Sequence, residues 1–256
     1  MSEENEQPWL SIVTVVKDDP SGFEQTRLSV VNQSIKGFEW VVVDSSTVKL
    51  SDQGTDVYSW SEPNGVFPAM NVGLEICVGQ RVLFLNAGDV LNEKETLEQI
   101  HGLSSDADKS AVLFGDVAFV SEDGLKIVVP PPLDFDFERS RQFSAGRFPP
   151  HQGVIAPRTL LLELGGFDES YKVASDYKTT LLLAERTTFK YMSLVITRFT
   201  LGGVSSQNWL ASLREFHRAR VEVFHLSGLS RVRSGLWASL QLLKMATVRI
   251  WRKFSV

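Results

Sequence analysis

The sequence predicts an α/β fold in which a mostly parallel sheet carries helices on both faces and a helical extension follows at the C-terminal end. Over the first hundred residues, short apolar runs alternate with segments of helical periodicity, as in parallel sheets. The chain has 256 residues, of which 43% are hydrophobic, so it can bury a large core. From Leu210 onward there are nine basic and only two acidic residues, which sets the extension apart from an otherwise acidic chain.

The first half is expected to contain four buried strands and three helices. Leu10–Val16 is a β-branched run, and Asp44 closes a second apolar run. Pro68 fits the first turn of a helix, because proline lacks only a donor that is unpaired there anyway. The expected strands are Leu10–Val16, Trp40–Val43, Val57–Trp60 and Val82–Leu85, and the expected helices cover about 23–34, 68–78 and 93–103.

The second half has a different pattern. Ser121-Glu122-Asp123-Gly124 is a hairpin-like connection, and residues 130–150 form a long loop rich in Pro, Phe, Asp and Arg. Gly165-Gly166 closes a short helix. The expected elements are strands at Ala111–Val120, Lys126–Val129 and Phe189–Phe199, helices at Thr159–Leu164 and Tyr177–Glu185, a turn at Gly202–Ser205, and helix from about Asn208 onward.

Composition excludes several classes of protein. A formal net charge of −5 argues against a general nucleic-acid binder. The single cysteine, Cys77, lies in an apolar helical pattern and is expected to be a core residue, so no intrachain disulfide can form. The acidic N-terminus lacks the features of a signal peptide, and no apolar run reaches about 18 residues. We therefore expect a cytoplasmic protein.

Acidic residues stand where the chemistry of such sheets is found. Ligands bind beyond the carboxyl ends of parallel strands, and Asp44, Glu62 and Asp89 fall at such ends. Asp44 is either an acceptor for a nucleobase or ribose or an ordinary turn residue. Asp89 is either a ligand for a divalent cation or the cap of the next helix. Asp176, at an expected helix start, is either a general base or an N-cap.

The ordered set of motifs resembles family 2 glycosyltransferases of the GT-A fold. The Asn86-Ala87-Gly88-Asp89 strand end is similar to the Asn-x-Gly-Asp motif of a bacterial polysaccharide-type branch of that family. The other motifs that carry the resemblance are Glu62-Pro63-Asn64, Ala69-Met70-Asn71 with Gly73, His151-Gln152, Gly166-Phe167-Asp168, Val173 to Tyr177, and Gly202 to Ser205. The resemblance runs from about Leu10 to Ser206. It divides the chain into an acidic tail (1–9), a GT-A domain (10–206) and a basic amphipathic helical extension (207–256).

The resemblance implies an inverting, metal-dependent glycosyltransferase. Such an enzyme moves a sugar from a nucleotide-diphosphate donor to a glycan or lipid-linked acceptor. Asp89 would then bind Mg²⁺ or Mn²⁺, which neutralises the leaving diphosphate, and Asp176 would take the proton of the acceptor hydroxyl. The residues expected to contact the donor nucleotide or its diphosphate are Asp44, Glu62, Asn64, Asn71, Asn86 and His151.

The sequence also departs from the family pattern. Pro68 replaces a frequent aspartate, Val72 replaces a lysine that would offer charge to a phosphate, and Val48-Lys49 stand where a second aspartate is usual. These departures motivate an alternative, a degenerate homologue that binds a nucleotide or glycan as a partner protein without turnover. A dinucleotide-dependent enzyme lacks support, because no Gly-x-Gly-x-x-Gly follows the first strand.

The basic C-terminal region has two interpretations. Arginines alternate with apolar residues that include Trp237 and Trp251, a pattern typical of helices that lie in a membrane interface. The region would then hold the protein peripherally on the inner membrane face. Alternatively, the charges form the solvated face of helices that pack on the domain.

Overall fold

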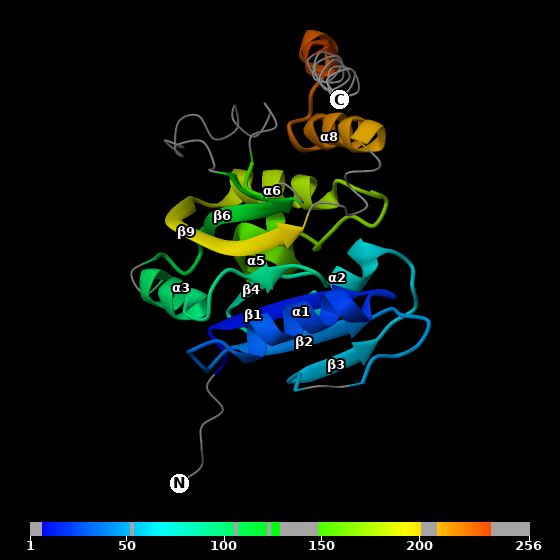
Figure 1. Ribbon diagram of the computed structural model, residues 1–256. Coiled ribbons are helices and arrows are strands. Elements are labelled where there is room, and N and C mark those ends of the chain that lie inside the picture. The colour runs from blue at the N-terminus through cyan, green and yellow to red at the C-terminus, as the bar shows by residue number, and fades with distance from the viewer. Residues whose placement is uncertain are drawn as a thin grey trace.

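A computed structural model describes residues 7–51, 54–104, 107–121, 124–128, 148–200 and 209–236. Most of the expected long loop, the expected turn at Gly202–Ser205 and the last twenty residues lie outside these ranges. The predicted mixed α/β fold is confirmed. Within the described ranges the strands join into one sheet, and helices cover both of its faces (Figure 1).

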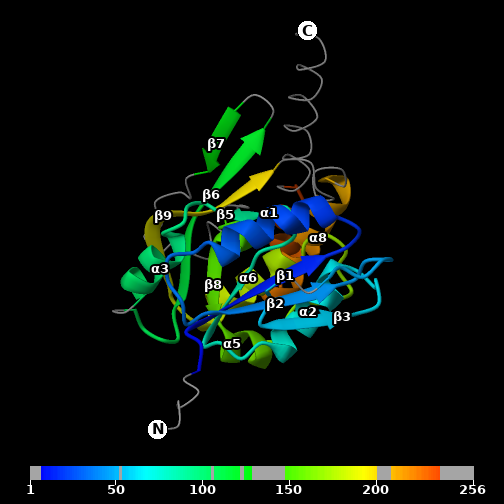
Figure 2. The same ribbon diagram turned by 60° about the horizontal axis from the view of Figure 1, so that its bottom comes forward.

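The sheet combines a parallel half and a mixed half. Its strand order is β3-β2-β1-β4-β8-β6-β9-β5, and β7 pairs with β6. The pairs among β1 to β4 are parallel, whereas β8 runs antiparallel to both β4 and β6. Figure 2 shows β6 and β7 as a hairpin that extends beyond the neighbouring strands. The strands are β1 (Leu10–Val16), β2 (Glu39–Asp44), β3 (Val57–Trp60), β4 (Arg81–Phe84), β5 (Val90–Leu91), β6 (Val112–Ser121), β7 (Gly124–Val128), β8 (Val154–Pro157) and β9 (Phe189–Thr200).

Two hydrophobic cores lie on opposite faces of the sheet. In β1, Val13 and Val15 enter one core, while Ile12 and Val16 enter the other, as the alternation of a strand requires. The first core is covered by α2, α5, α6 and α8, and the second by α1 and α3. The helices are α1 (Pro20–Val31), α2 (Val66–Ile76), α3 (Thr96–Ser104), α5 (Arg158–Glu163), α6 (Ser175–Arg186) and α8 (Trp209–Val223), and residues 228–236 are also helical.

The C-terminal region packs on the body of the fold. Helix α8 lies beside α6 (Figure 1), and its Ala219 is fully buried in the first core together with Tyr177 of α6. Helix 228–236 is tied to α8 because Arg220 Nε donates to Ser234 Oγ at 3.1 Å. Burial of one face of α8 agrees with the interpretation that these helices pack on the domain.

Strand β8 has the largest consequence for the site. The sequence analysis did not predict it, because Val154–Pro157 ends on a proline, which disfavours a strand inside a sheet. Since β8 is antiparallel to β4, the residues just before it lie at the same edge of the sheet as the carboxyl ends of β1 and β4. His151–Gly153, a single 3₁₀ turn, therefore lies at the carboxyl edge of the parallel strands, where ligands bind in such sheets.

Candidate active site

The loop after β4 is held tightly at the carboxyl edge of the sheet. Leu85 and Ala87 continue the pairing with β1, since their backbone N–H groups donate to the carbonyls of Val13 and Val15 at 2.9 and 3.1 Å. The chain then turns at Gly88, whose φ of 92° lies in the left-handed region that favours glycine. This turn places Asn86 and Asp89 at the strand end.

Asp89 is buried at this turn, with only 3% of its surface exposed. Its backbone is fixed by Thr26, whose Oγ1 donates to the Asp89 carbonyl at 2.8 Å. Burial raises the pKa of Asp89 to about 7, against the opposing effects of His151 and a hydrogen bond from Gln152. Its Oδ2 atom is buried and has no hydrogen-bond partner. A carboxylate in this state gains from any cation that reaches it.

His151 stands between two predicted site residues. Its Nδ1 lies 3.1 Å from Asp176 Oδ2, and its Nε2 lies 3.3 Å from Asn86 Nδ2. Burial lowers the pKa of His151, but the hydrogen bond and charge of Asp176 and the charge of Asp89 outweigh it and raise the pKa. In the neutral ring, Nδ1–H donates to Asp176 and Nε2 accepts from Asn86. Asn86 Oδ1 is buried without a partner, so turning this amide over would let it accept from a protonated Nε2 instead.

Asp176 lies inside the first turn of α6 rather than at its N-cap. The N-cap residue is Ala174, which offers no side-chain cap. One oxygen of Asp176 accepts from the N–H of Tyr177 at 2.8 Å, and the other meets His151. Asp176 therefore lies at the end of the helix where the dipole favours negative charge. Residues 89 and 176, far apart in the sequence, thus interact with one imidazole.

The donor set at this edge fits a hard divalent cation. Asn86 Oδ1 and Asp89 Oδ2 are buried oxygens without partners, and oxygen is what Mg²⁺ and Mn²⁺ prefer. Among the residues that the structure describes, no group of three His, Cys, Asp or Glu could hold an ion. A cation here would therefore need further ligands from a bound diphosphate, as is usual for Mg²⁺.

The carboxylate of Asp44 is hydrogen-bonded mainly within the loop that follows it. Its fully buried carboxylate accepts from Ser46 N and Leu50 N, each at 2.8 Å, and from Tyr58 OH at 2.6 Å. Burial acts to raise the pKa of Asp44, but these hydrogen bonds lower it below its ordinary value. Asp44 thus shapes the loop that follows β2.

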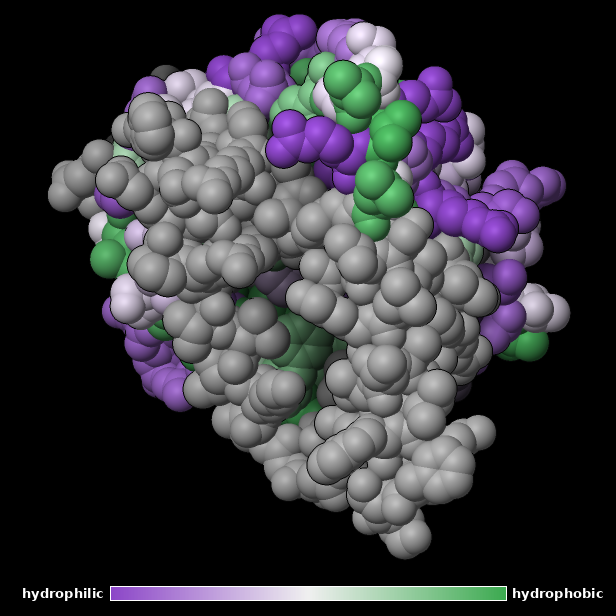
Figure 3. Space-filling model, turned by 90° about the horizontal axis from the view of Figure 1, so that it is seen from above, coloured by the Kyte–Doolittle hydropathy of each residue, from purple (hydrophilic) through white to green (hydrophobic). Residues whose placement is uncertain are grey.

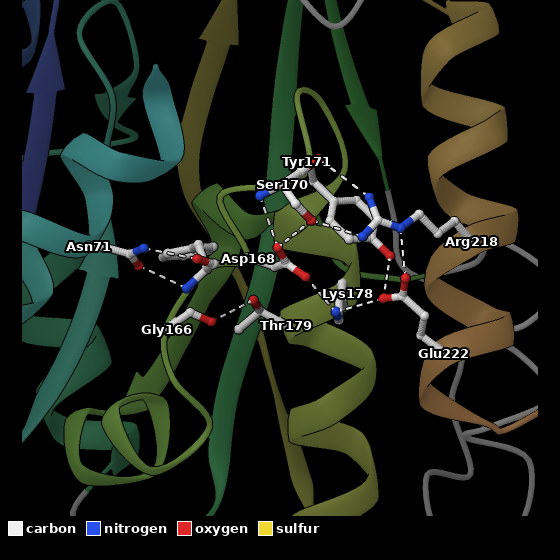
Figure 4. A network of polar contacts seen from close by, with 10 residues as sticks. Asn71, Gly166, Asp168, Ser170, Tyr171, Lys178, Thr179, Arg218 and Glu222 are labelled. Carbon is white, nitrogen blue, oxygen red and sulfur yellow. Dashed lines mark hydrogen bonds and ion pairs between the residues drawn. The ribbon is translucent and has the colours of Figure 1, made fainter. Parts of the chain in front are cut away.

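The other predicted donor contacts fall into two groups. Glu62 and Asn64 are exposed in the turn after β3, where Asn64 N donates to the Glu62 carbonyl at 2.8 Å. Asn71 instead joins α2 to the segment after α5: its amide donates to the Phe167 carbonyl at 2.9 Å and accepts from Phe167 N at 2.8 Å (Figure 4). With Glu169 as a third partner, the amide of Asn71 is largely occupied by the protein.

Two further polar residues near this edge were not among the expected site residues, although one of them, Gln152, belongs to the His151-Gln152 motif. The side chain of Gln152 acts to lower the pKa of Asp89, and its place beside His151 in the His151-Gln152 motif was the signal in the sequence. Asp116 on β6 lies across from Gln152 if the β6–β8 register is continued by two residues. It is nine-tenths buried, its Oδ2 accepts from Tyr191 OH at 2.9 Å, and its Oδ1 is buried without a partner. No local pattern marks Asp116, because only strand pairing brings it here.

A network of charged residues ties α6 to α8. Lys178 Nζ lies 2.6 Å from Asp168 Oδ2 and 2.7 Å from Glu222 Oε2 on α8 (Figure 4). Arg218 Nε lies 2.7 Å from Glu222 Oε1, and Tyr171 OH donates to the same carboxylate at 2.9 Å. The network joins α6, α8 and the loop between α5 and α6.

Solved structures with a similar fold include two that hold a nucleotide sugar. One is TarS residues 1–349 from S. aureus in complex with UDP-GlcNAc, with a TM-score of 0.62 and 19% identity over 91% of this chain and 71% of that one. The chain spans 41% of a longer TarS structure. Another is the mannosyltransferase PcManGT from Pyrobaculum calidifontis in complex with GDP-Man and Mn²⁺, with a TM-score of 0.58 and 17% identity over 95% of this chain. The fold is of the GT-A type.

Proteins related to this chain by sequence also bear the name glycosyltransferase. An uncharacterized glycosyltransferase of Mycobacterium tuberculosis is 27% identical over 219 residues, which cover 78% of both chains. A PGL/p-HBAD biosynthesis glycosyltransferase of Mycobacterium bovis is 26% identical over 198 residues, 70% of this chain and 72% of its own length. No protein-family model matches the chain. These similarities support glycosyl transfer as the activity.

Proposed function

We propose that this protein is an inverting glycosyltransferase of family 2 that uses a nucleotide-diphosphate sugar and a divalent cation. The observation that carries the proposal is that His151 contacts Asp176 and lies near enough to Asp89 for the charge of Asp89 to act on the imidazole. One carboxylate is buried with an unpaired oxygen, and the other lies in the first turn of a helix, where the helix dipole favours negative charge. These are the two electrostatic tasks of the reaction: neutralising a leaving diphosphate and accepting a proton.

The chemistry assigns one role to each group. An acceptor hydroxyl oxygen attacks the anomeric carbon, the bond from that carbon to the diphosphate breaks, and the hydroxyl proton passes to Asp176. Both Asp176 oxygens keep a free lone pair in spite of their contacts with His151 and Tyr177. A cation bound at Asp89, with Asn86 beside it, would supply Lewis-acid stabilisation of the leaving diphosphate. Inversion follows if base and leaving group flank opposite faces of the sugar ring.

The donor site would lie between the ends of β1, β2 and β3. Glu62 and Asn64 are exposed there and free to meet a ligand, whereas Asp44 would act by fixing the shape of its loop. Relatives of known structure bind UDP-GlcNAc and GDP-Man, so a nucleotide-diphosphate sugar is the proposed donor class. The experiment is a thermal-shift screen of UDP, GDP, dTDP and CDP sugars with Mn²⁺, followed by a transfer assay with the donor that stabilises most.

The competing function is nucleotide or glycan binding without turnover. The engaged side chains of Asp44 and Asn71 favour it, because these groups have little capacity left for a donor. A nucleotide that raises the melting temperature while donor hydrolysis and transfer are both undetectable would support this alternative.

We also propose a glycan or lipid-linked acceptor at an anionic membrane surface. Helix 228–236 exposes Leu229, Val232 and Leu236 to 82%, 57% and 60%, at helical spacing, with exposed Arg231 and Arg233 beside them. Figure 3 shows apolar side chains beside strongly hydrophilic ones on this end of the molecule. In the described part of the chain, no helix has the length and apolar character needed to cross a membrane.

A further inference from the structure

The segment just before α6 is held by a carboxylate from another helix. Glu215 lies in the middle of α8, and its Oε1 accepts from Lys172 N at 2.9 Å. Its Oε2 accepts from Val173 N and Ala174 N, also at 2.9 Å each. Three consecutive backbone N–H groups thus converge on one side chain.

This arrangement is an anion-binding nest filled by the protein itself. Successive N–H groups that point to a common centre attract negative charge, and the start of a helix adds to that attraction. Helix α6 has no side-chain cap of its own, since Ala174 stands at the N-cap. Glu215, on α8, therefore binds the N–H of the N-cap residue of α6 and those of the two residues before it.

The nest ends two residues before Asp176. Any shift of the 172–174 backbone moves the first turn of α6, and with it the carboxylate that meets His151 at 3.1 Å. Two further contacts tie α6 to the segment before it, Lys178 to Asp168 at 2.6 Å and Thr179 Oγ1 to the Gly166 carbonyl at 3.1 Å, but both lie beyond Asp176 in the helix. A displacement of about 1 Å in a reacting group can cost roughly a hundredfold in rate.

We propose that Glu215 is a positioning residue that holds Asp176 in its catalytic orientation through the 172–174 nest. The proposal rests on the proposed function of Asp176. It makes α8, which follows the predicted GT-A domain in the sequence, a supporting part of the active site. Glu215 itself touches no reacting atom.

The test compares Glu215→Ala and Glu215→Gln with Glu222→Ala. Glu222 lies on the same helix and binds Lys178 and Tyr171, but it makes no contact with the nest. We expect Glu215→Ala to lower the transfer kcat about 10- to 100-fold with the donor KM within about twofold. Glu215→Gln keeps an acceptor oxygen and should fall between Glu215→Ala and the wild type. Glu222→Ala should lower the melting temperature but leave kcat within about twofold.

Rescue of the transfer rate by formate distinguishes a positioning role of Glu215 from a merely structural role. In Glu215→Ala, formate at about 0.1 M can enter the emptied nest and should restore part of the lost transfer. Formate should leave the transfer rate of the wild type unchanged. A kcat for Glu215→Ala equal to that of Glu222→Ala, or a loss that formate does not relieve, would overturn the proposal. If Glu215→Ala does not fold, Glu215→Gln carries the comparison.

A second measurement separates this inference from the proposed function. The imidazole NMR signals of His151 report its hydrogen bond to Asp176 without any turnover. We expect the Nδ1–H signal to be lost or shifted in Glu215→Gln and retained in Glu222→Ala. An unchanged signal in Glu215→Gln would contradict the positioning role of Glu215. Absence of transfer by the wild type would contradict only the proposed function.

Discussion

His151 Nδ1 lies 3.1 Å from Asp176 Oδ2, and this contact joins the turn before β8 to the first turn of α6. The same ring reaches Asn86 at the end of β4 through Nε2. His151 therefore links the loop that would hold the diphosphate to the carboxylate that would take the proton. Changes in charge on the donor side can reach Asp176 through this single side chain.

Replacement of His151 should separate its two contacts. Asn can present an amide near the position of Nδ1, whereas Gln can present one near Nε2. We expect His151→Ala to lower the transfer kcat by about tenfold or more, in the range of a lost positioning contact, and His151→Asn to recover more of it than His151→Gln. Steady-state kinetics with both substrates measure this. Equal losses in Asn and Gln variants would show that the Asp176 contact is not the one that matters.

Asp89→Asn tests the proposed cation site. The amide keeps the shape of the side chain but removes its charge, so Mn²⁺ should no longer raise the melting temperature in the presence of a nucleoside diphosphate. Transfer at saturating Mn²⁺ should fall by at least about a hundredfold, since the leaving group is no longer neutralised. Glu163→Gln, an exposed carboxylate change on α5, is the control and should leave both unchanged. A full Mn²⁺ response in Asp89→Asn would remove Asp89 from the site.

Asp168 should make stability depend on pH. Burial acts to raise its pKa, but the hydrogen bonds from Lys178 and Ser170 lower it to about 2. Because the folded pKa lies below the unfolded value of 3.8, the stabilisation is present above about pH 4 and is lost as pH falls toward 2. After allowance for partial exposure, Asp168→Asn should reduce the unfolding free energy by about 1 kcal/mol at neutral pH. Urea titrations at pH 7 and pH 2.5 measure this, and an equal difference at both would contradict it.

The exposed apolar residues of helix 228–236 should contribute to membrane contact. Replacing Leu229, Val232 and Leu236 by Ser should reduce co-sedimentation with vesicles that contain about 30% anionic lipid, since both apolar burial and basic charge favour such surfaces. The same substitutions should leave binding of the soluble donor unchanged. Equal recovery of the wild type and the triple variant with the vesicles would assign this surface another role.

The parallel half of the fold was predictable because its signals are local. Strands β1 to β4 agree with their expected bounds to within one or two residues. The expectation that all four are buried was wrong for β3, which lies at the edge of the sheet and leaves Trp60 exposed. Pro68 lies in the first turn of α2 as expected, although the helix begins at Val66. The resemblance to a known family then selected Asp89 and Asp176 from among many carboxylates.

The rest of the site depends on long-range pairing that no local pattern reveals. The pairing of β8 with β4 and β6 delivers His151 and Gln152 and brings Asp116 close to them. Asp44 and Asn71 are engaged by the protein itself, which becomes visible only once Tyr58 and Phe167 are placed beside them. In the sequence, Glu215 is one of two acidic residues in a basic C-terminal region. In the structure, its carboxylate accepts hydrogen bonds from the turn that leads to Asp176.

The central claim is that Asp176 takes the acceptor's proton in a site whose cation is held at Asp89. The most direct measurement is the rate of transfer by Asp176→Asn, with donor affinity determined on the same preparation by calorimetry in the presence of Mn²⁺. The account predicts unchanged donor affinity within about twofold and a transfer rate lowered by roughly 10²- to 10⁴-fold. Transfer at the wild-type rate by Asp176→Asn would contradict it.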